Sequence, residues 1–284
     1  PSTVHRPLSA VLITLLTDFG SQDGYVAAMK GVVLARAPGA RLVDVSHEVA
    51  PQDVMAAAFV LRQAWPHFPP GPVHLVVVDP GVGTERRAVA ARFGDHLVVG
   101  PDNGLFPLAF APSIVGDVAS AQPDEAVVLD DPKMWRTAEP SRTFHGRDLF
   151  APAAAALASG APLADLGSPL DALRPMHWLQ PQADAHGIQG WVLHLDRFGN
   201  AITNIPRALV EAHADGRAVK GYVGSTILRG IQPTYGAVAE GDPLLLYGSD
   251  GLLEVGVRGG SAASLLSLRQ GMRLQLVFSC HRLR

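Results

Sequence analysis

The chain has 284 residues, 48% of them hydrophobic and 17% charged, with a formal net charge of -3, which is typical of a folded globular protein and not of a disordered one. No cluster of lysine and arginine residues could follow a phosphate backbone, so a nucleic-acid partner is not expected. The one cysteine, Cys280, excludes an intramolecular disulfide framework and a cysteine-rich zinc module, and it fits the reducing cytoplasm.

The first half of the chain alternates strands with helices. The opening apolar run AVLITLL (residues 10–16) is too short to span a bilayer and continues into Thr-Asp-Phe-Gly, so we expect a core strand and no membrane association. The expected strands are 11–20, 41–49, 73–79 and 96–104, and the expected helices are 25–37, 50–65 and 146–160. Near-continuous apolar strands between helices predict an α/β domain, with a largely parallel sheet covered by helices on both faces.

The texture of the sequence changes near residue 175. Residues 176–190 are rich in proline, glutamine and glycine, and we expect them to link an N-terminal α/β domain (1–175) to a C-terminal domain (191–284). Short runs of strand composition follow, at 190–196, 200–205, 218–224, 242–248, 252–257 and 272–278. Glycine, aspartate and proline separate these runs, a pattern that predicts a small all-β domain.

Polar residues come directly after the expected strands of the first domain. They are Asp18 after the first strand, Asp44, Ser46 and His47 after the second, residues 79–87 after the third, and Asp102 and Asn103 after the fourth. Open parallel sheets bind ligands at the carboxyl ends of their strands, so these side chains are expected at one edge. The segment RTFHGRD (142–148) leads into the last helix of this domain and adds further polar groups.

Common motifs do not account for these residues. GVGTER keeps two glycines of the dinucleotide fingerprint, but Arg86 stands in place of the third, and AVAARF (88–93) after it has strand composition. The sequence contains no GxxxxGK[ST] phosphate loop, no complete nucleophile elbow and no HExxH zinc motif. A metal site built from His47, Asp79 and His145 is an alternative, although their spacing matches no usual ligand pattern.

The strongest chemical prediction rests on Asp79, Arg86 and His145. Arg86 is always charged and can fix a water or an anion, while Asp79 can orient either partner. His145 precedes a helix whose positive end disfavours an imidazolium, which leaves a neutral ring able to act as a base. The structural alternative is a salt bridge that closes a loop, beside a histidine that caps a helix.

Six motifs resemble those of the S-adenosyl-L-methionine (SAM) hydroxide adenosyltransferases, relatives of the fluorinating and chlorinating enzymes that attack the same compound. They occur in order along nearly the whole chain: TDFG (17–20), DPGVGTERR (79–87), VGPDNG (99–104), TFHGRD (143–148), DRFGNAITNI (196–205) and GSDGLLEVGVRGGSAA (248–263). The resemblance implies a barrel-like C-terminal domain and a homotrimer that binds the nucleoside between the N-terminal domain of one subunit and the C-terminal domain of its neighbour. It also implies hydrolysis of SAM, in the family's preferred R epimer at sulfur, to adenosine and L-methionine, without a metal or a further cofactor.

Carried over residue by residue, the resemblance assigns the water-holding or hydroxide-holding triad to Asp79, Arg86 and His145. The implied substrate contacts are Asp79 itself, Asp18 for the ribose hydroxyls, Asn200 for adenine, Asp196 for the methionine ammonium, and Ser249, Glu254 and Val257 in the strip that closes the pocket. A carboxylate can accept from both hydroxyls of a diol, and an amide can both donate to and accept from an adenine edge. Arg258 stands where the family usually has asparagine, so a side-chain contact made there would be altered.

Several of these residues also have a purely structural interpretation. Asp18 is also suited to a strand-end turn, Asn200 to a glycine-containing turn, and Phe198 to a core position instead of stacking on adenine. Arg87 has the character of a surface or interface charge. At the level of function, a halogenase would need a small halide pocket in place of the charged triad, and a noncatalytic adenosine-binding or SAM-binding protein would retain the same residues.

Overall fold

The computed structural model describes residues 12–116 and 121–282, with side chains up to Ser279. Ala10, Val11 and the side chain of Cys280 therefore lie outside the described residues. The chain forms two compact units: one comprises the described residues up to Ala111 and from Ala121 to Met176, and the other comprises 112–116 and the residues from His177 onward. The short excursion at 112–116 falls within the span expected for the first domain.

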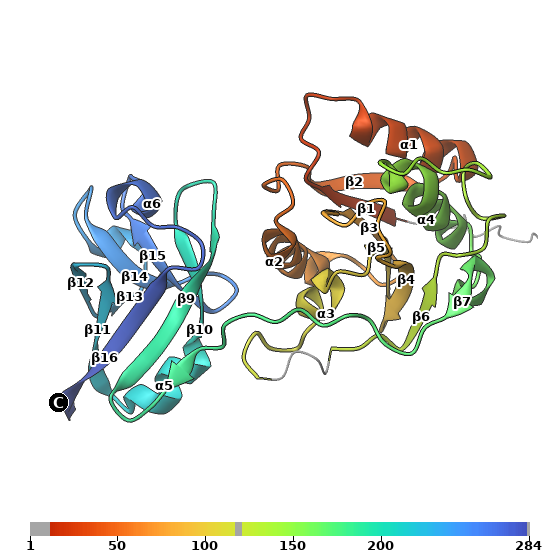
Figure 1. The fold of residues 1–284 in the computed structure, drawn as a ribbon. Helices are drawn as coiled ribbons and strands as arrows, with labels where there is room; N and C mark the ends of the chain where they lie inside the picture. The colour runs from red at the N-terminus through yellow and green to blue at the C-terminus, as the bar shows by residue number, and fades with distance from the viewer. Residues whose placement is uncertain (1–11, 117–120, 283–284) are drawn as a thin grey trace, which may run out of the picture. The chain divides into compact units, whose positions relative to one another are not determined.

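The first unit contains a seven-stranded sheet in the order β2-β1-β3-β5-β4-β6-β7 (Figure 1). Its strands are β1 Leu12–Thr17, β2 Arg41–Ser46, β3 Val73–Val77, β4 Ala88–Phe93, β5 His96–Pro101, β6 Glu125–Val128 and β7 Ser168–Pro169. Strands β2, β1, β3 and β5 pair in parallel, whereas β4, β6 and β7 add antiparallel pairs. The α/β prediction is confirmed, and two of the predicted site residues, Asp18 and Asp79, follow strands of the parallel half of the sheet.

Helices cover this sheet on both faces (Figure 1). Helices α1 (Tyr25–Arg36) and α4 (Ala151–Ala158) pack together on one face, and α2 (Val54–Ala64) and α3 (Leu105–Ala109) pack together on the other. Helix α2 begins at Val54, four residues after the expected start at residue 50, and Asp53 caps it by accepting a hydrogen bond from the Ala56 N–H at 2.9 Å. A π-helical turn, η3 (Gly146–Phe150), leads directly into α4. The apolar face of each helix is buried against the sheet, which holds the strand ends in fixed positions.

The second unit is built around a nine-stranded sheet in the order β12-β11-β16-β9-β10-β15-β14-β13, with β8 paired to β9. Its strands are β8 Gln182–Ala183, β9 Gly187–Leu195, β10 Ala201–Pro206, β11 Arg217–Val223, β12 Thr226–Arg229, β13 Ile231–Gln232, β14 Pro243–Tyr247, β15 Leu252–Val257 and β16 Arg273–Arg282. Neighbours are antiparallel except β13 and β14, and β12 at one end of the order also contacts β14 near the other, so the sheet is barrel-like.

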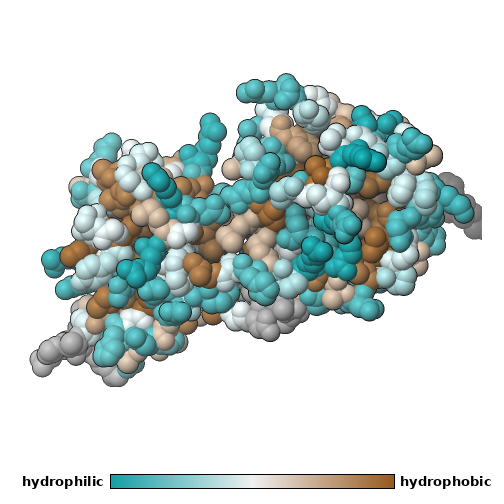
Figure 2. Space-filling model, in the orientation of Figure 1, coloured by the Kyte–Doolittle hydropathy of each residue, from teal (hydrophilic) through white to brown (hydrophobic). Residues whose placement is uncertain are grey.

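Two helices in the second unit were not expected from the sequence, α5 (Arg207–Ala214) and α6 (Ala262–Leu265). Helix α5 has only eight residues, so its apolar positions extend over little more than two turns and give no extended helical period in the sequence. Figure 2 shows hydrophobic patches between hydrophilic side chains on the visible surface. Among the described residues, no helix is both long and apolar enough to cross a membrane.

A pair of stacked histidines, one of them buried, lies within the first unit. His74 in β3 is fully buried, with its Nδ1 atom 2.7 Å from Thr14 Oγ1 and its Nε2 atom 3.0 Å from His96 Nδ1. The two imidazole rings are stacked with centroids 5.3 Å apart. Burial, helped by the neighbouring His96, lowers the pKa of His74 from 6.5 to about 3. Between pH 6.5 and about 3, His74 is therefore neutral in the native state, whereas it becomes protonated in the unfolded chain.

This shift predicts a loss of stability in acid. Above pH 6.5 the His74 ring is neutral in both states, and the full unfolding free energy is present. As the pH falls from 6.5 towards 3 the unfolding free energy decreases, because the unfolded state takes up the proton first. The expected slope is about 1.4 kcal/mol per pH unit within this window. Urea unfolding at several pH values should show a flatter acid dependence for His74→Gln, which can still form hydrogen bonds but does not titrate. Equal pH dependence of the variant and the parent would contradict the prediction.

Candidate functional site

Loops at the carboxyl edge of the parallel strands carry four of the predicted side chains. Asp18 follows β1, Asp79 lies just beyond β3, Arg86 lies just before β4, and His145 immediately precedes η3. Strands β1 and β3 are parallel neighbours, so their carboxyl ends are adjacent. Strand β4 runs the other way and begins beside the carboxyl end of β5. The topology therefore gathers these residues at one edge, as the sequence predicted.

Asp79, Arg86 and His145 are in direct contact. The Arg86 Nε atom donates to Asp79 Oδ1 at 2.9 Å, and its Nη2 atom donates to Asp79 Oδ2, which gives a two-pronged ion pair. The same Nη2 atom lies 2.9 Å from His145 Nδ1. The Asp79 and Arg86 side chains are only 6% and 7% exposed, and the guanidinium lies over the Phe150 ring. The predicted trio is thus assembled, and its Asp79–Arg86 pair also closes the loop, as the structural alternative required.

The contact with Arg86 fixes the hydrogen-bonding state of His145. A guanidinium has only donors, so Nδ1 of His145 must accept, and the proton of the neutral ring resides on Nε2. Burial lowers the pKa of His145, and the positive charge of Arg86 lowers it further. The sequence attributed a neutral ring to the helix end, whereas the causes of the lowered pKa are burial and Arg86. The ring can gain a proton only at Nδ1, the atom already engaged with Arg86.

Glycines in the 79–87 loop allow it to contact the segment that carries His145. Gly83 has φ +75°, and a Cβ atom there would overlap the carbonyl oxygen of Arg142. Gly81 packs against the side chain of Arg86, where a Cβ atom would lie 3.0 Å from its Cγ atom. The glycines therefore serve close packing between two loops. This explains why the loop contains glycines although the dinucleotide fingerprint is incomplete.

A buried carboxylate anchors the segment around His145. Asp148 is 1% exposed and accepts from Arg147 Nε at 2.7 Å, from Arg136 Nε at 2.5 Å and from the Ser141 N–H at 2.9 Å. The Arg147 and Arg136 guanidiniums hold the pKa of this carboxyl well below its usual range. Asp148 was not among the predicted site residues, and its position three residues after His145 in TFHGRD was the only available signal. Asp148 pins both ends of the turn that presents His145.

Asp18 has one engaged carboxylate oxygen. The Gln52 N–H donates to Asp18 Oδ2 at 2.7 Å, and Oδ1 has no hydrogen-bond partner among the described residues. Asp18 therefore has a structural role, as the turn alternative supposed, because its carboxylate connects the loop after β1 to the loop before α2. The other carboxylate oxygen is thus able to accept a further hydrogen bond.

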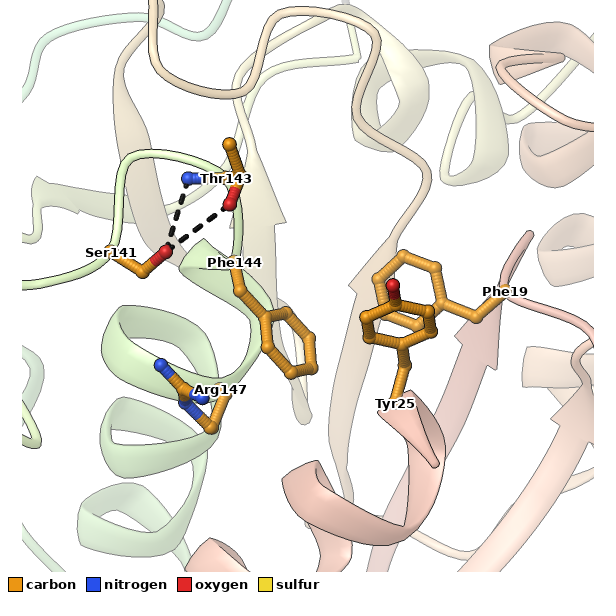
Figure 3. Close-up of a pocket in the computed structure, with 6 residues that line it drawn as sticks. All are labelled: Phe19, Tyr25, Ser141, Thr143, Phe144 and Arg147. Carbon is orange, nitrogen blue, oxygen red and sulfur yellow. Dashed lines mark hydrogen bonds between the residues drawn. The ribbon is translucent and has the colours of Figure 1, made fainter. Parts of the chain in front are cut away.

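A pocket of about 340 Å³ lies beside the chain neighbours of Asp18 and His145 (Figure 3). It is lined by Phe19, Tyr25, Ser141, Thr143, Phe144 and Arg147. Figure 3 shows the three aromatic rings gathered together, and the Phe144 ring lies 5.9 Å from that of Phe19 and 5.2 Å from that of Tyr25. The Arg147 guanidinium lies over the Phe144 ring at 5.1 Å. This pocket was not predicted, because its two walls are separated by more than a hundred residues in the sequence.

In the second unit, Asp196 and Asn200 form one closed turn between β9 and β10. Asp196 Oδ1 accepts from the N–H groups of Phe198 and Asn200 at 2.9 and 2.8 Å, and Asp196 Oδ2 accepts from Asn200 Nδ2 at 2.8 Å. Asn200 is 7% exposed, whereas Phe198 is 77% exposed. The core alternative for Phe198 is therefore wrong, and its ring is available at the surface. The turn alternative for Asn200 holds, but its side-chain oxygen is not used within the turn.

Glu254 lies near this turn, on β15. It is 8% exposed and accepts from the Tyr235 hydroxyl at 3.3 Å. Burial, together with the neighbouring Asp250, raises the pKa of Glu254, and burial beside Glu254 raises the pKa of Tyr235 to about 12. A Cβ atom on Gly256 would lie 3.2 Å from Asn200 Oδ1 and closer still to the Tyr235 ring, so these groups converge. Tyr235 was not predicted, because it belongs to no motif in the sequence.

The other predicted positions of the second unit lie near the ends of β15. Val257 is buried at the end of this strand, and Ser249 is exposed in the turn before it. The Arg258 guanidinium donates to the Val238 carbonyl at 2.7 Å, so its side chain fastens a neighbouring loop. The structure thus brings Asp196, Asn200 and Glu254 close together and shows no hydrogen bond from Ser249 to them.

His47, Asp79 and His145 are not arranged as the ligands of one metal ion, as the metal alternative required. His47 Nδ1 lies 2.8 Å from Thr17 Oγ1 and His47 Nε2 lies 3.0 Å from Asp44 Oδ1, while a guanidinium stands between Asp79 and His145. In the part of the chain that the structure describes, no three histidine, cysteine, aspartate or glutamate side chains are grouped to hold a metal ion.

The chain matches both domains of one enzyme family. The SAM hydroxide adenosyltransferase N-terminal domain matches residues 13–167, and the C-terminal domain of the same family matches residues 190–275. The (R)-S-adenosyl-L-methionine hydrolase of Thermus thermophilus is 44% identical over 93% of this chain and 99% of its own, and a fluorinase of an Actinoplanes species is 26% identical over 92% and 95%. A crystal structure of an uncharacterized conserved protein from Thermotoga maritima has a TM-score of 0.84 at 34% identity, covering 93% of this chain and 99% of that one.

Proposed function

This chain belongs to the SAM hydroxide adenosyltransferase family, and on that premise we propose that it is an enzyme that hydrolyses SAM to adenosine and L-methionine. The observation that carries the proposal is the contact between Asp79, Arg86 and His145 at the edge of the sheet. The preferred substrate is the R epimer at sulfur, which is the substrate named for the Thermus thermophilus relative.

The reaction needs positioning more than activation of the leaving group. Water attacks the ribose 5′-carbon, the carbon–sulfur bond breaks, methionine leaves as a neutral thioether, and one proton is released. A sulfonium therefore requires neither a general acid nor a metal to leave. Holding the water in line behind the carbon can supply about 7–11 kcal/mol in favourable cases.

The geometry divides the work among the three side chains. Arg86 fixes the trio and supplies positive charge, and the Nε2–H group of His145 donates to the oxygen of the attacking water. Asp79 is the only member of the trio with spare lone pairs, since a carboxylate has about four acceptor sites and Arg86 uses two of them. We therefore assign the water proton to Asp79, and His145 becomes a donor instead of the base expected from sequence.

Substrate contacts are assigned to both units of the chain. Asp18 offers its unengaged oxygen to the ribose hydroxyls, and Asn200 offers its amide oxygen to the adenine amino group. Asp196 meets the methionine ammonium, with Ser249, Glu254 and Val257 closing the pocket. The resemblance to this family is the basis for proposing a homotrimer with each pocket shared between subunits. A cytoplasmic location is proposed from the single cysteine in the sequence.

The halogenase alternative has less support. Fluorinases share about a quarter of their residues with this chain, for example 26% for the Actinoplanes protein, whereas the named hydrolase shares 44%. A halide pocket would also have to replace a charged trio that is intact here. A noncatalytic SAM-binding protein would keep the same contacts, so only turnover separates it from an enzyme.

Incubation with each SAM epimer in water enriched in oxygen-18 tests the proposal. We expect adenosine and methionine, with the label in the 5′-hydroxyl of adenosine and faster turnover of the R epimer. Addition of chloride should leave the product unchanged. Tight nucleoside binding without adenosine formation would favour the noncatalytic alternative, and chlorodeoxyadenosine would establish a halogenase.

A further inference from the structure

The motif VGPDNG has no part in the function proposed so far, yet it lies between the two stems of the loop that carries Asp79 and Arg86. Strand β5 stands between β3, which ends just before Asp79, and β4, which begins just after Arg86. Asp102 and Asn103 follow the end of β5 directly. The sheet order therefore places both side chains between the points where the loop leaves the sheet and returns to it.

Asn103 holds the first stem. Its Nδ2 atom donates to the carbonyl oxygen of Val78, the residue before Asp79, at 2.9 Å. Its Oδ1 atom accepts from the Leu105 N–H at 3.3 Å, which fixes which way the amide faces. The donor is therefore aimed at the stem by a second contact at the start of α3.

Asp102 holds the second stem. Its Oδ2 atom accepts from Arg87 Nε at 2.8 Å and from Arg87 Nη2 at 2.5 Å, and its Oδ1 atom accepts from the Arg174 N–H at 2.8 Å. Asp102 is 2% exposed, and its own N–H donates to the Arg87 carbonyl at 3.0 Å. Arg87 keeps the partly exposed position predicted for it, with 34% of its side chain exposed, but its guanidinium also pairs with a buried carboxylate.

We propose that Asp102 and Asn103 are positioning residues of the hydrolytic site, which clamp both stems of the 79–87 loop and so fix the direction from Arg86 to His145. The clamp acts on residues adjacent to Asp79 and Arg86, not on the substrate. The loop between the stems is turn-rich, with Thr84 Oγ1 donating to the Gly81 carbonyl at 2.7 Å, so fixed stems define the whole loop. This inference rests on the proposed hydrolase function.

Asn103→Asp tests the first half of the clamp with a matched control. The substitution keeps the acceptor for Leu105 and removes the donor to Val78. Asn204 in the second unit has the same pattern, donating to the Leu179 carbonyl at 2.7 Å and accepting from the Trp191 N–H at 2.8 Å, and it is fully buried. Asn204→Asp should therefore destabilise the fold at least as much, with no effect on the loop.

For Asn103→Asp we expect kcat to fall about 10- to 100-fold, as small misplacements of reacting groups do, while the adenosine dissociation constant stays within about twofold. Asn204→Asp should retain the kcat of the parent. In a nuclear magnetic resonance titration, the pKa of His145 should rise in Arg87→Lys, which loosens the second stem without changing the net charge, because Arg86 helps to lower that pKa. A purely structural role would not move that pKa.

Arg87→Lys tests the second half and serves if Asn103→Asp fails to fold. It keeps the charge beside Asp102 and removes the two-pronged contact, so kcat should fall while the unfolding free energy changes little. Parent-like kcat in folded Asn103→Asp and Arg87→Lys, with an unchanged His145 pKa, would overturn the clamp. A parent protein that forms no adenosine would instead overturn the proposed function, so the two failures are distinguishable.

Discussion

Replacement of Arg86 by alanine is expected to lower kcat/KM for SAM by at least about 10²- to 10³-fold, the range seen when one preorganised donor is removed from an active site. Arg86 is the only one of the three side chains that contacts both others, since it pairs with Asp79 and donates to His145. Its loss therefore removes the positive charge, and Asp79 and His145 are no longer held in position relative to each other. Adenosine affinity should remain close to that of the parent, because none of the assigned nucleoside contacts involves Arg86.

The variant needs a measure of stability beside its kinetics. Removing Arg86 leaves Asp79 buried without its partner, and breaking such a pair costs about 3–5 kcal/mol. Arg86→Lys keeps a positive charge and loses the fork, so it should be more stable than Arg86→Ala and still slow. Arg92→Ala is the matched control, because Arg92 pairs with Glu125 at an exposed position and should keep full activity.

A parallel substitution separates turnover from binding. Asp18→Ala removes the oxygen assigned to the ribose hydroxyls, so it should weaken adenosine binding as well as lower kcat/KM. Calorimetric titration with adenosine distinguishes the two patterns. Parent-like turnover in folded Arg86→Ala, or equal losses of adenosine affinity in both variants, would contradict the division between catalytic and binding residues.

Most of the site could be predicted from the sequence, because sheet topology determines where the strand ends lie. Carboxyl ends of parallel strands meet at one edge, and Asp18, Asp79 and Arg86 lie beside such ends or at the return of the loop. His145 lies on a different loop, more than fifty residues after Arg86 in the sequence. It was grouped with Asp79 and Arg86 only because of its chemistry and the family resemblance. The contact with Arg86 then altered its expected role, because a hydrogen-bond direction cannot be obtained from spacing.

The residues that sequence reasoning missed are those whose partners lie far along the chain. Arg87 is partly exposed, as predicted, but its pairing with Asp102 was not predicted, because Asp102 lies fifteen residues later, after a strand that inserts between β3 and β4. Asp148 and Tyr235 similarly depend on contacts with Arg136 and Glu254. Long apolar strands and capped helices were predictable from local pattern, whereas short elements such as β6, β7 and α5 take their structure from tertiary neighbours.

The proton acceptor can be identified by comparing Asp79→Asn with His145→Gln. Glutamine can accept from Arg86 and donate to water, the two contacts assigned to His145, but it cannot take up a proton. If Asp79 accepts the proton, His145→Gln should lose about tenfold or less, whereas Asp79→Asn should lose about 10²- to 10⁴-fold, the usual contribution of a positioned base. Single-turnover assays with saturating SAM measure this step without interference from product release.

The pH dependence adds a second test of the same assignment. The pKa of His145 is lowered by burial and by Arg86, so its ring is neutral at pH 7 and becomes protonated only as the pH falls below 6.5. Protonation requires Nδ1 to leave Arg86, so activity should decline in acid, and the part of that decline due to His145 should vanish in His145→Gln. If His145→Gln were as inactive as His145→Ala while Asp79→Asn kept substantial activity, the imidazole would be the base. Arg86 would then have to release Nδ1 during the reaction, because that nitrogen is the only one in the neutral ring with a lone pair to offer.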